Sequence, residues 1–116
     1  MKTIRIDRKD QVLKGRIKLP FSKSISNRLL IIRGLSEEKF TIHNLSDSGD
    51  TLLLEGLLQE VLQQKDPSRL KEIDAEDAGT VMRFLVAFLS ILPGKWVLTG
   101  TSRMRQRPIG VLVDGL

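Results

Sequence analysis

Basic side chains lie at three places where the sequence pattern predicts the start of a helix. Lys23 and Arg28 surround the first such start, and Arg83 lies in the first turn of a later predicted helix. Arginines within residues 103–107 precede the last one. A helix N-terminus carries a partial positive charge, so basic residues there are unfavourable by roughly a few tenths of a kcal/mol. A bound anion removes this conflict, because free N–H groups, the dipole and the basic side chains then favour one negative ligand.

The residue types favour phosphate or carboxylate as that anion, since arginine offers planar bidentate contacts and lysine a point charge. Ser22, Ser24 and Ser26 add hydroxyl donors on the approach to the first helix. Gly79 permits a ligand to come close to the backbone. One such cluster is more often a solvated basic turn than a binding site. Three clusters at three helix starts favour binding.

Composition narrows the possible classes of protein. The net charge of +5 indicates anionic partners, which include nucleic acid, a membrane surface and small phosphorylated metabolites. The contents of 41% hydrophobic and 28% charged residues are ordinary for a soluble globular protein. The absence of cysteine excludes disulfides, thiolate zinc sites and a cysteine nucleophile, and the single histidine, His43, leaves no histidine metal cluster.

At 116 residues the chain has the length of one small domain. Its apolar runs are far shorter than the roughly 20 residues that span a bilayer, and its first residues show no signal-peptide pattern. We therefore predict a cytoplasmic protein without a membrane partner.

The N-terminal part predicts two strands followed by a helix. Residues 3–6 and 15–19 alternate apolar and polar side chains, as half-buried strands do, with a polar turn at residues 9–11. From Ser26 the spacing becomes helical and continues to Gly34, with an apolar line at Ile25, Leu29 and Ile32.

The middle part predicts a strand, a long helix and a weaker strand. The first strand covers residues 40–43, and the second covers residues 70–75, after a break at Pro67. Ser48 is a suitable N-cap for the helix between them, and Asp50 complements its dipole. The apolar face of this helix comprises Leu53, Leu54, Leu57, Leu58 and Val61.

The C-terminal part predicts a helix from about Ala78, a strand at residues 96–99 and a last helix. The first of these helices has its apolar face at Val81, Phe84, Leu85, Phe88 and Leu89. Residues 103–107 are basic and irregular, and Pro108 suits the first position of a helix that reaches Leu116. The element order is that of an α/β (α+β) fold.

Four segments resemble, in the right order, signatures of the EPSP synthases (3-phosphoshikimate 1-carboxyvinyltransferases). Residues 22–28 resemble the family's Ser-Lys-Ser-(Ile/Val)-Ser-Asn-Arg, and residues 45–51 its Asp-Ser-Asp-Asp segment. Residues 78–83 resemble Ala-Gly-Thr-Ala-Met-Arg, and residues 98–110 contain a run similar to Arg-Met-(Lys/Arg)-Glu-Arg-Pro-Ile-Gly.

The resemblance implies a partial enolpyruvyl transferase domain built from βαβαββ-type units. Residues 1–116 would be the N-terminal portion, with the first unit, part of the second, and no second domain. The family transfers enolpyruvyl from phosphoenolpyruvate to the 5-hydroxyl of shikimate 3-phosphate and releases phosphate, on the route to chorismate and the aromatic amino acids. It uses neither a metal nor an organic cofactor.

The resemblance also implies roles for five residues. Lys23 would be catalytic, contacting both substrates and stabilising charge as the tetrahedral centre forms. Ser24 and Arg28 would bind shikimate 3-phosphate. Gly79 and Arg107 would bind phosphoenolpyruvate, Gly79 through close approach of the backbone and Arg107 by charge.

Four positions depart from the family pattern. Phe21 replaces a common Gly, Gly49 an Asp, Asp77 an Asn, and Phe84 a typical Pro. These departures indicate a divergent branch of the family and a slightly different setting of Gly79.

The family's general-base Asp and further Lys and Arg ligands belong to its later domain, so we expect this chain to have no turnover without the missing C-terminal part. The alternative is a non-catalytic phosphate- or nucleic-acid-binding module. The low aromatic content, with one Trp and no Tyr, and the absence of a helix lined with Lys and Arg count against a nucleic-acid partner.

Overall fold

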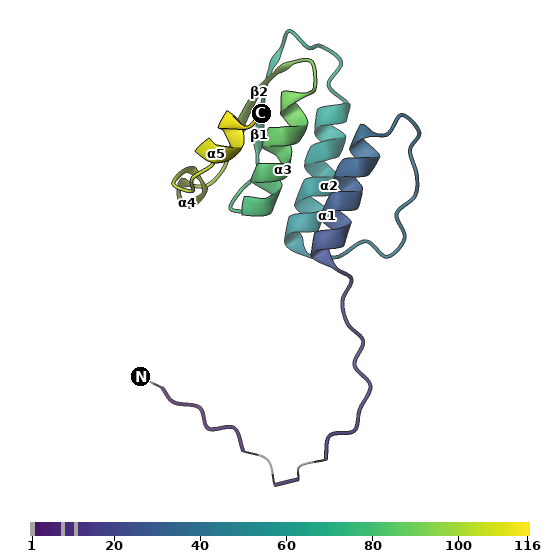
Figure 1. Ribbon diagram of the computed structural model, residues 1–116, viewed down its shortest axis with the longest axis vertical. Coiled ribbons are helices and arrows are strands. Elements are labelled where there is room, and N and C mark those ends of the chain that lie inside the picture. Colours follow the sequence, from purple (N-terminus) through teal and green to yellow (C-terminus); the bar gives the residue numbers. More distant parts are fainter. Residues whose placement is uncertain (1, 8, 11) are drawn as a thin grey trace.

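The computed structural model describes residues 2–7, 9–10 and 12–116. Within them the chain forms helices and two short strands (Figure 1). In chain order these are α1 (Lys23–Leu35), α2 (Gly49–Leu62), β1 (Leu70–Asp74), α3 (Gly79–Ser90), β2 (Lys95–Thr99), α4 (Ser102–Arg105) and α5 (Gly110–Asp114).

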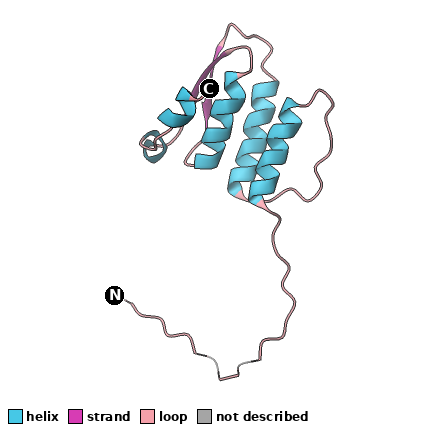
Figure 2. Ribbon diagram, in the orientation of Figure 1, coloured by secondary structure: helices cyan, strands magenta, loops and turns pink. Residues whose placement is uncertain are grey.

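The two strands pair in parallel, with Leu70 opposite Lys95 and Asp74 opposite Thr99. Parallel strands need a crossover connection, which α3 provides. Figure 2 shows the strands side by side next to the helices. The mixed α/β class predicted from the sequence is therefore confirmed, and so are the strands expected at residues 70–75 and 96–99, to within a residue at their ends.

Helices α1, α2 and α3 run in the same direction (Figure 1). An extended segment after α1 returns the chain to the start of α2, and β1 returns it to the start of α3. The N-termini of all three helices consequently lie at one end of the molecule.

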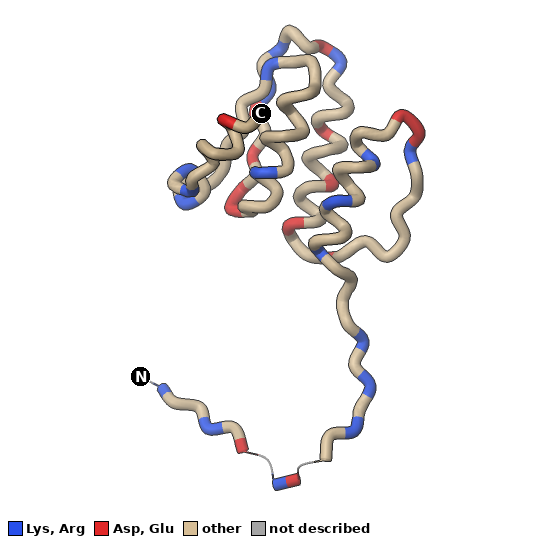
Figure 3. The backbone as a smooth tube through the Cα atoms, in the orientation of Figure 1, with Lys and Arg blue, Asp and Glu red and all other residues tan. Residues whose placement is uncertain are grey.

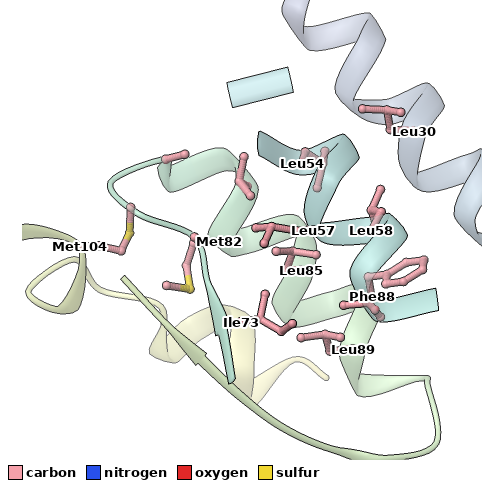
Figure 4. Packing of buried hydrophobic residues seen from close by; sticks show 14 residues of the cluster. Leu30, Leu54, Leu57, Leu58, Ile73, Met82, Leu85, Phe88, Leu89 and Met104 are labelled. Carbon is pink, nitrogen blue, oxygen red and sulfur yellow. The ribbon is translucent and has the colours of Figure 1, made fainter. Parts of the chain in front are cut away.

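The core lies between α2, α3 and the strands, with Leu30 added from α1 (Figure 4). The apolar faces predicted for α2 and α3 are confirmed except that Leu53 and Phe84 are half-buried and Met82 is buried. The buried apolar side chains are Leu30, Leu54, Leu57, Leu58, Val61, Ile73, Ala75, Ala78, Val81, Met82, Leu85, Phe88, Leu89 and Met104.

Helix α1 turns a different face inward from the one predicted. Ile25 and Ile32 are 62% and 52% exposed, whereas Ser26, Asn27 and Leu30 are buried. The apolar periodicity gave the wrong face because buried polar side chains of α1 accept hydrogen bonds from other parts of the chain, the Ser26 hydroxyl from the Ser46 N–H and Asn27 Oδ1 from the Thr51 hydroxyl.

The strands predicted at residues 3–6, 15–19 and 40–43 were wrong for the described chain, where these segments are extended or bent without strand pairing. The turn predicted at residues 9–11 includes Gln11, which lies outside the described residues. A strand is stable only when its backbone groups pair with a neighbour. The isoleucines of the first two segments meet no such neighbour and remain 84–93% exposed.

The C-terminal segment differs from the prediction in two ways. It contains an additional short helix, α4, and its last helix, α5, is shorter than expected. Residues 103–107 were expected to be irregular, but Thr101 caps α4 by accepting a hydrogen bond from the Met104 N–H (3.3 Å). Helix α5 begins two residues after Pro108, because Ile109 has a non-helical φ of −127°, and it ends before Leu116.

Candidate functional site

Lys23 lies between the N-termini of α1 and α2. The Ser22 hydroxyl caps α1 by accepting a hydrogen bond from the Ile25 N–H (3.3 Å), which makes Lys23 the first helical residue. The Lys23 Nζ donates to Asp50 Oδ2 at 2.9 Å. Asp50 lies in the first turn of α2, as predicted, and stabilises the positive end of that helix. One carboxylate thus serves both a helix dipole and the ammonium group.

Buried side chains tie the start of α1 to the start of α2. The Thr51 hydroxyl donates to Asn27 Oδ1 at 2.7 Å and lies 2.9 Å from the Ser48 hydroxyl. The Ser26 hydroxyl accepts from the Ser46 N–H at 2.9 Å. Ser26 was expected to offer its hydroxyl to a ligand, but it is only 3% exposed and binds this loop instead.

Asn27 and Thr51 were not singled out from the sequence, although both are fully buried. The available signal was their placement: Asn27 precedes Leu30 by three residues and Thr51 precedes Leu54 by three, so each shares a helix face with a core leucine. This network fixes the backbone that presents Lys23.

Ser24 and Arg28 are exposed on α1. The Arg28 Nη1 donates to the Ser24 carbonyl at 2.9 Å. Its guanidinium carbon lies 5.7 Å from the centre of the Phe84 ring, which belongs to α3. Arg28 therefore connects the start of α1 to the first turns of α3.

Gly79 is the first residue of α3, and two arginine side chains lie against it. A Cβ at this position would overlap the Arg107 guanidinium and come within 3.3 Å of Arg83 Nη1. Arg83 also donates to the carbonyls of Gly79 (3.2 Å) and Pro108 (3.3 Å). The absence of a side chain at Gly79 is what lets both guanidinium groups reach the helix start.

Arg83 was predicted in the first turn of its helix, and the structure places it one turn later, as the fifth residue of α3. Side chains of a helix lean toward its N-terminus. The guanidinium consequently still reaches the Gly79 carbonyl, so the expected grouping of charge at the helix start is present even though the position was wrong.

The loops that carry Gly79 and Arg107 follow β1 and β2 and are joined to each other. The Thr101 N–H donates to the Glu76 carbonyl at 2.9 Å. A Cβ on Gly100 would lie 2.5 Å from that same carbonyl oxygen, so the loops approach too closely for any other residue there. Parallel α/β sheets bind ligands at the carboxyl ends of their strands, and this end carries both residues.

Several arginines at this end have no carboxylate of a described residue in contact with them. Among the described residues Lys23 pairs with Asp50, whereas Arg28, Arg83 and Arg107 have no carboxylate within 4.0 Å. Figure 3 shows basic residues gathered at the α4 turn, and acidic residues on the segment that leads into α3. An anion is the missing partner that this arrangement fits.

The five site residues predicted from the sequence thus form two groups. Lys23, Ser24 and Arg28 belong to the start of α1, whereas Gly79 and Arg107 touch each other at the start of α3. No hydrogen bond between described residues joins Lys23 to the second group; the link is Arg28, through the Phe84 ring. Both groups lie at the end where α1, α2 and α3 begin (Figure 1).

A model of the family EPSP synthase (3-phosphoshikimate 1-carboxyvinyltransferase) matches residues 8–116. The chain belongs to the EPSP synthase family. Its four signature segments, at residues 22–28, 45–51, 78–83 and 98–110, contain the starts of α1, α2 and α3 and the loop around α4. The EPSP synthase signatures are therefore gathered at one end of the fold.

Three bacterial EPSP synthase relatives, each called 3-phosphoshikimate 1-carboxyvinyltransferase, illustrate the similarity. The protein of Bacteroides fragilis (strain YCH46) is 48% identical over 104 residues, which cover 90% of this chain and 23% of the relative. Those of Nitrosomonas eutropha and Paraburkholderia phytofirmans are 41% and 39% identical, covering 88% of this chain and 27% of each relative. The chain thus spans about a quarter of the length of the curated relatives it matches. No solved structure matches it.

Membrane-spanning helices and metal-binding clusters are both absent from the described residues. None of their helices combines the length and the apolar character needed to cross a membrane. Nor do they contain a group of three or more His, Cys, Asp or Glu side chains placed to hold a metal ion. The cytoplasmic location stays a prediction from the sequence.

Proposed function

We propose that this chain forms the N-terminal part of the substrate site of a 3-phosphoshikimate 1-carboxyvinyltransferase. The observation that carries the proposal is the gathering of four family signatures at one end of the fold, where guanidinium groups without carboxylate partners lie beside helix N-termini. Such an end suits two small anions, and the proposed substrates are shikimate 3-phosphate and phosphoenolpyruvate.

In the proposed reaction the 5-hydroxyl oxygen of shikimate 3-phosphate bonds to C2 of phosphoenolpyruvate, while the hydroxyl proton is lost and C3 takes up a proton. The C2–O bond to phosphate then breaks and the new C3 methyl group loses a proton, which releases inorganic phosphate and leaves the enolpyruvyl ether. Lys23 is the proposed catalytic residue, because its ammonium lies between two helix starts and can stabilise negative charge as the intermediate forms. The roles proposed here for residues of this chain involve neither a metal nor a cofactor.

Each of the two groups of residues is assigned mainly to one substrate. Ser24 and Arg28 are assigned to shikimate 3-phosphate, because a hydroxyl and an exposed guanidinium stand one helical turn apart on α1. Gly79 and Arg107 are assigned to phosphoenolpyruvate, since the bare backbone at the start of α3 admits a close approach and Arg107 supplies charge.

The remaining part of the proposed site comes from the C-terminal part of the same enzyme. General acid–base catalysis needs a titratable group within hydrogen-bond reach of the proton. The family's general-base Asp belongs to the part that this chain does not cover. We therefore propose that residues 1–116, the first βαβαββ-like unit and part of the second, have no turnover alone.

A chimera tests this function. The chain replaces the 104-residue segment that it matches in the Bacteroides fragilis protein, and phosphate release is measured with both substrates. We expect turnover in the chimera and a loss of roughly 10²- to 10³-fold in Lys23→Met, as when one preorganised donor to the transition state is removed. Lys65→Met is the matched control, because Lys65 is exposed and has no ion pair among the described residues.

Near-normal turnover of Lys23→Met would remove Lys23 from the mechanism. A folded chimera that binds neither substrate would contradict the proposed function as a whole. If the chain instead bound DNA with steep salt dependence and ignored shikimate 3-phosphate, the nucleic-acid-binding alternative would be favoured.

A further inference from the structure

Arg28 is held in place by two contacts that leave its charge intact. One is the Ser24 carbonyl, which accepts a hydrogen bond from Nη1 at 2.9 Å. The other is the face of the Phe84 ring, 5.7 Å from the guanidinium carbon, within the range of a cation–π interaction. Among the described residues no carboxylate lies within 4.0 Å of Arg28. The guanidinium is therefore fixed without being neutralised.

Phe84 is suited to this task because its own position is well determined. It lies on α3, is half-buried, and packs against the buried core. Arg28 is exposed and on another helix, so without the ring its long side chain would sample many rotamers. The ring transfers the rigidity of the core to an exposed cation.

We propose that Phe84 is a positioning residue for Arg28, and that it holds the guanidinium ready for an anionic group of shikimate 3-phosphate. This inference rests on the proposed function. Phe84 stands where proline is typical of the family pattern, and proline has no aromatic face with which to hold a guanidinium. Phe84 is not expected to touch either substrate.

The contact itself is tested by nuclear magnetic resonance on the 116-residue chain. We expect the Arg28 Nε–Hε resonance to be displaced by the ring current of Phe84. In Phe84→Leu, which keeps an apolar side chain without a ring, the resonance should move to the value of an exposed arginine such as Arg103. Phe84→Tyr should keep the displacement. Phe40→Leu, which removes an exposed ring elsewhere, is the control and should leave it unchanged.

The positioning role is tested by kinetics in the chimera described above. We expect Phe84→Leu to raise the KM for shikimate 3-phosphate about two- to fivefold, as an exposed cation–π contact allows. Because Phe84 touches no reacting group, kcat and the KM for phosphoenolpyruvate should stay unchanged, and Phe84→Tyr should restore the affinity. In an Arg28→Gln background, Phe84→Leu should have no further effect, since contacting residues are not additive.

An Arg28 resonance that is the same in the unaltered chain and in Phe84→Leu would overturn the proposal. So would an equal rise of both KM values, or an undiminished effect in the Arg28→Gln background. A displaced Arg28 resonance in a chain whose chimera binds neither substrate would contradict the proposed function while supporting the contact. The two ideas therefore fail separately.

Discussion

The start of α1 and the start of α3 both carry basic side chains, but they handle the charge in opposite ways. At α1, the Lys23 ammonium is paired with a carboxylate, Asp50, and buried hydroxyl and amide groups fix the backbone below it. At α3, the guanidinium groups of Arg83 and Arg107 lie on a bare glycine, and Arg83 is held by carbonyl oxygens alone.

This difference determines what an incoming anion meets at each place. At the start of α3 it meets guanidinium groups and a helix dipole, and it competes with the carbonyl oxygens that hold Arg83 rather than with a carboxylate in an ion pair. At the start of α1 it must compete with Asp50 for Lys23. We infer that anions bind more readily at α3, and that Lys23 is released from Asp50 as the site fills.

On the α3 side, a large effect, second to that of Lys23→Met, is expected from Arg107→Ala in the chimera. Hydrogen bonds to charged groups contribute about 1.5–3 kcal/mol, so the KM for phosphoenolpyruvate should rise roughly 10- to 100-fold. The KM for shikimate 3-phosphate should change less. Arg103→Ala is the control, because Arg103 is an exposed arginine of the neighbouring helix α4. Equal effects on both substrates would count against the assignment of Arg107.

The α1 side should respond through stability. Thr51→Val keeps the shape but removes the hydroxyl that donates to Asn27 Oδ1. The Asn27 Nδ2 already has no partner among the described groups, so the variant would leave the buried Asn27 amide without the hydrogen bond that it accepts from Thr51. We expect a loss of about 1–2 kcal/mol in the free energy of unfolding, measured with urea. Thr80→Val, at an exposed position of α3, should change it little; equal losses in the two variants would argue against the buried network.

A smaller effect is expected from Asp50→Asn, which frees Lys23. Both partners are partly exposed, at 48% and 33% of their side chains, so the stability loss should be below about 1 kcal/mol. Affinity of the chain for inorganic phosphate should nevertheless increase, because a competing carboxylate has gone. Asp47→Asn, at an exposed position outside the ion pairs, is the control. Unchanged or weaker phosphate binding in Asp50→Asn would contradict the inference that Asp50 competes with an incoming anion for Lys23.

The smallest effect lies away from both regions, at the turn after α2. Hydrogen bonds from the Ser68 hydroxyl (2.6 Å) and N–H (2.9 Å) lower the pKa of Asp66 below its usual 3.8. Since the folded pKa is the lower one, this stabilisation is complete above pH 3.8 and is lost as the pH falls through the folded pKa. Titration followed by nuclear magnetic resonance should give a midpoint that rises toward 3.8 in Ser68→Ala. Phosphate binding near neutral pH should not respond.

The location of several candidate site residues at helix starts was predictable from the sequence, because capping and apolar spacing mark where helices begin. Ser22, Lys23 and Gly79 could be assigned once the helices were located, and capping residues together with apolar spacing located them. What could not be predicted was how each charge is held. That Lys23 pairs with Asp50 follows from the packing of α1 against α2, which local patterns do not encode.

Strands were predicted correctly where the strand they pair with belongs to the described chain. The two strands β1 and β2 pair with each other, and both were predicted. The alternating segments at residues 3–6 and 15–19 have the pattern of strands but no neighbour among the described residues, so their pattern did not become structure. The inward face of α1 was missed because periodicity counts apolar residues, whereas Ser26 and Asn27 are buried through hydrogen bonds.

Helices α1, α2 and α3 point the same way. Neighbouring antiparallel helices compensate one another electrically, but three aligned ones add their dipoles, and arginines reinforce the positive end. The resulting potential extends into solvent and should draw doubly or triply charged metabolites toward this end before any contact forms. Capture rates should therefore fall steeply with ionic strength, even where the final affinity depends on short-range bonds.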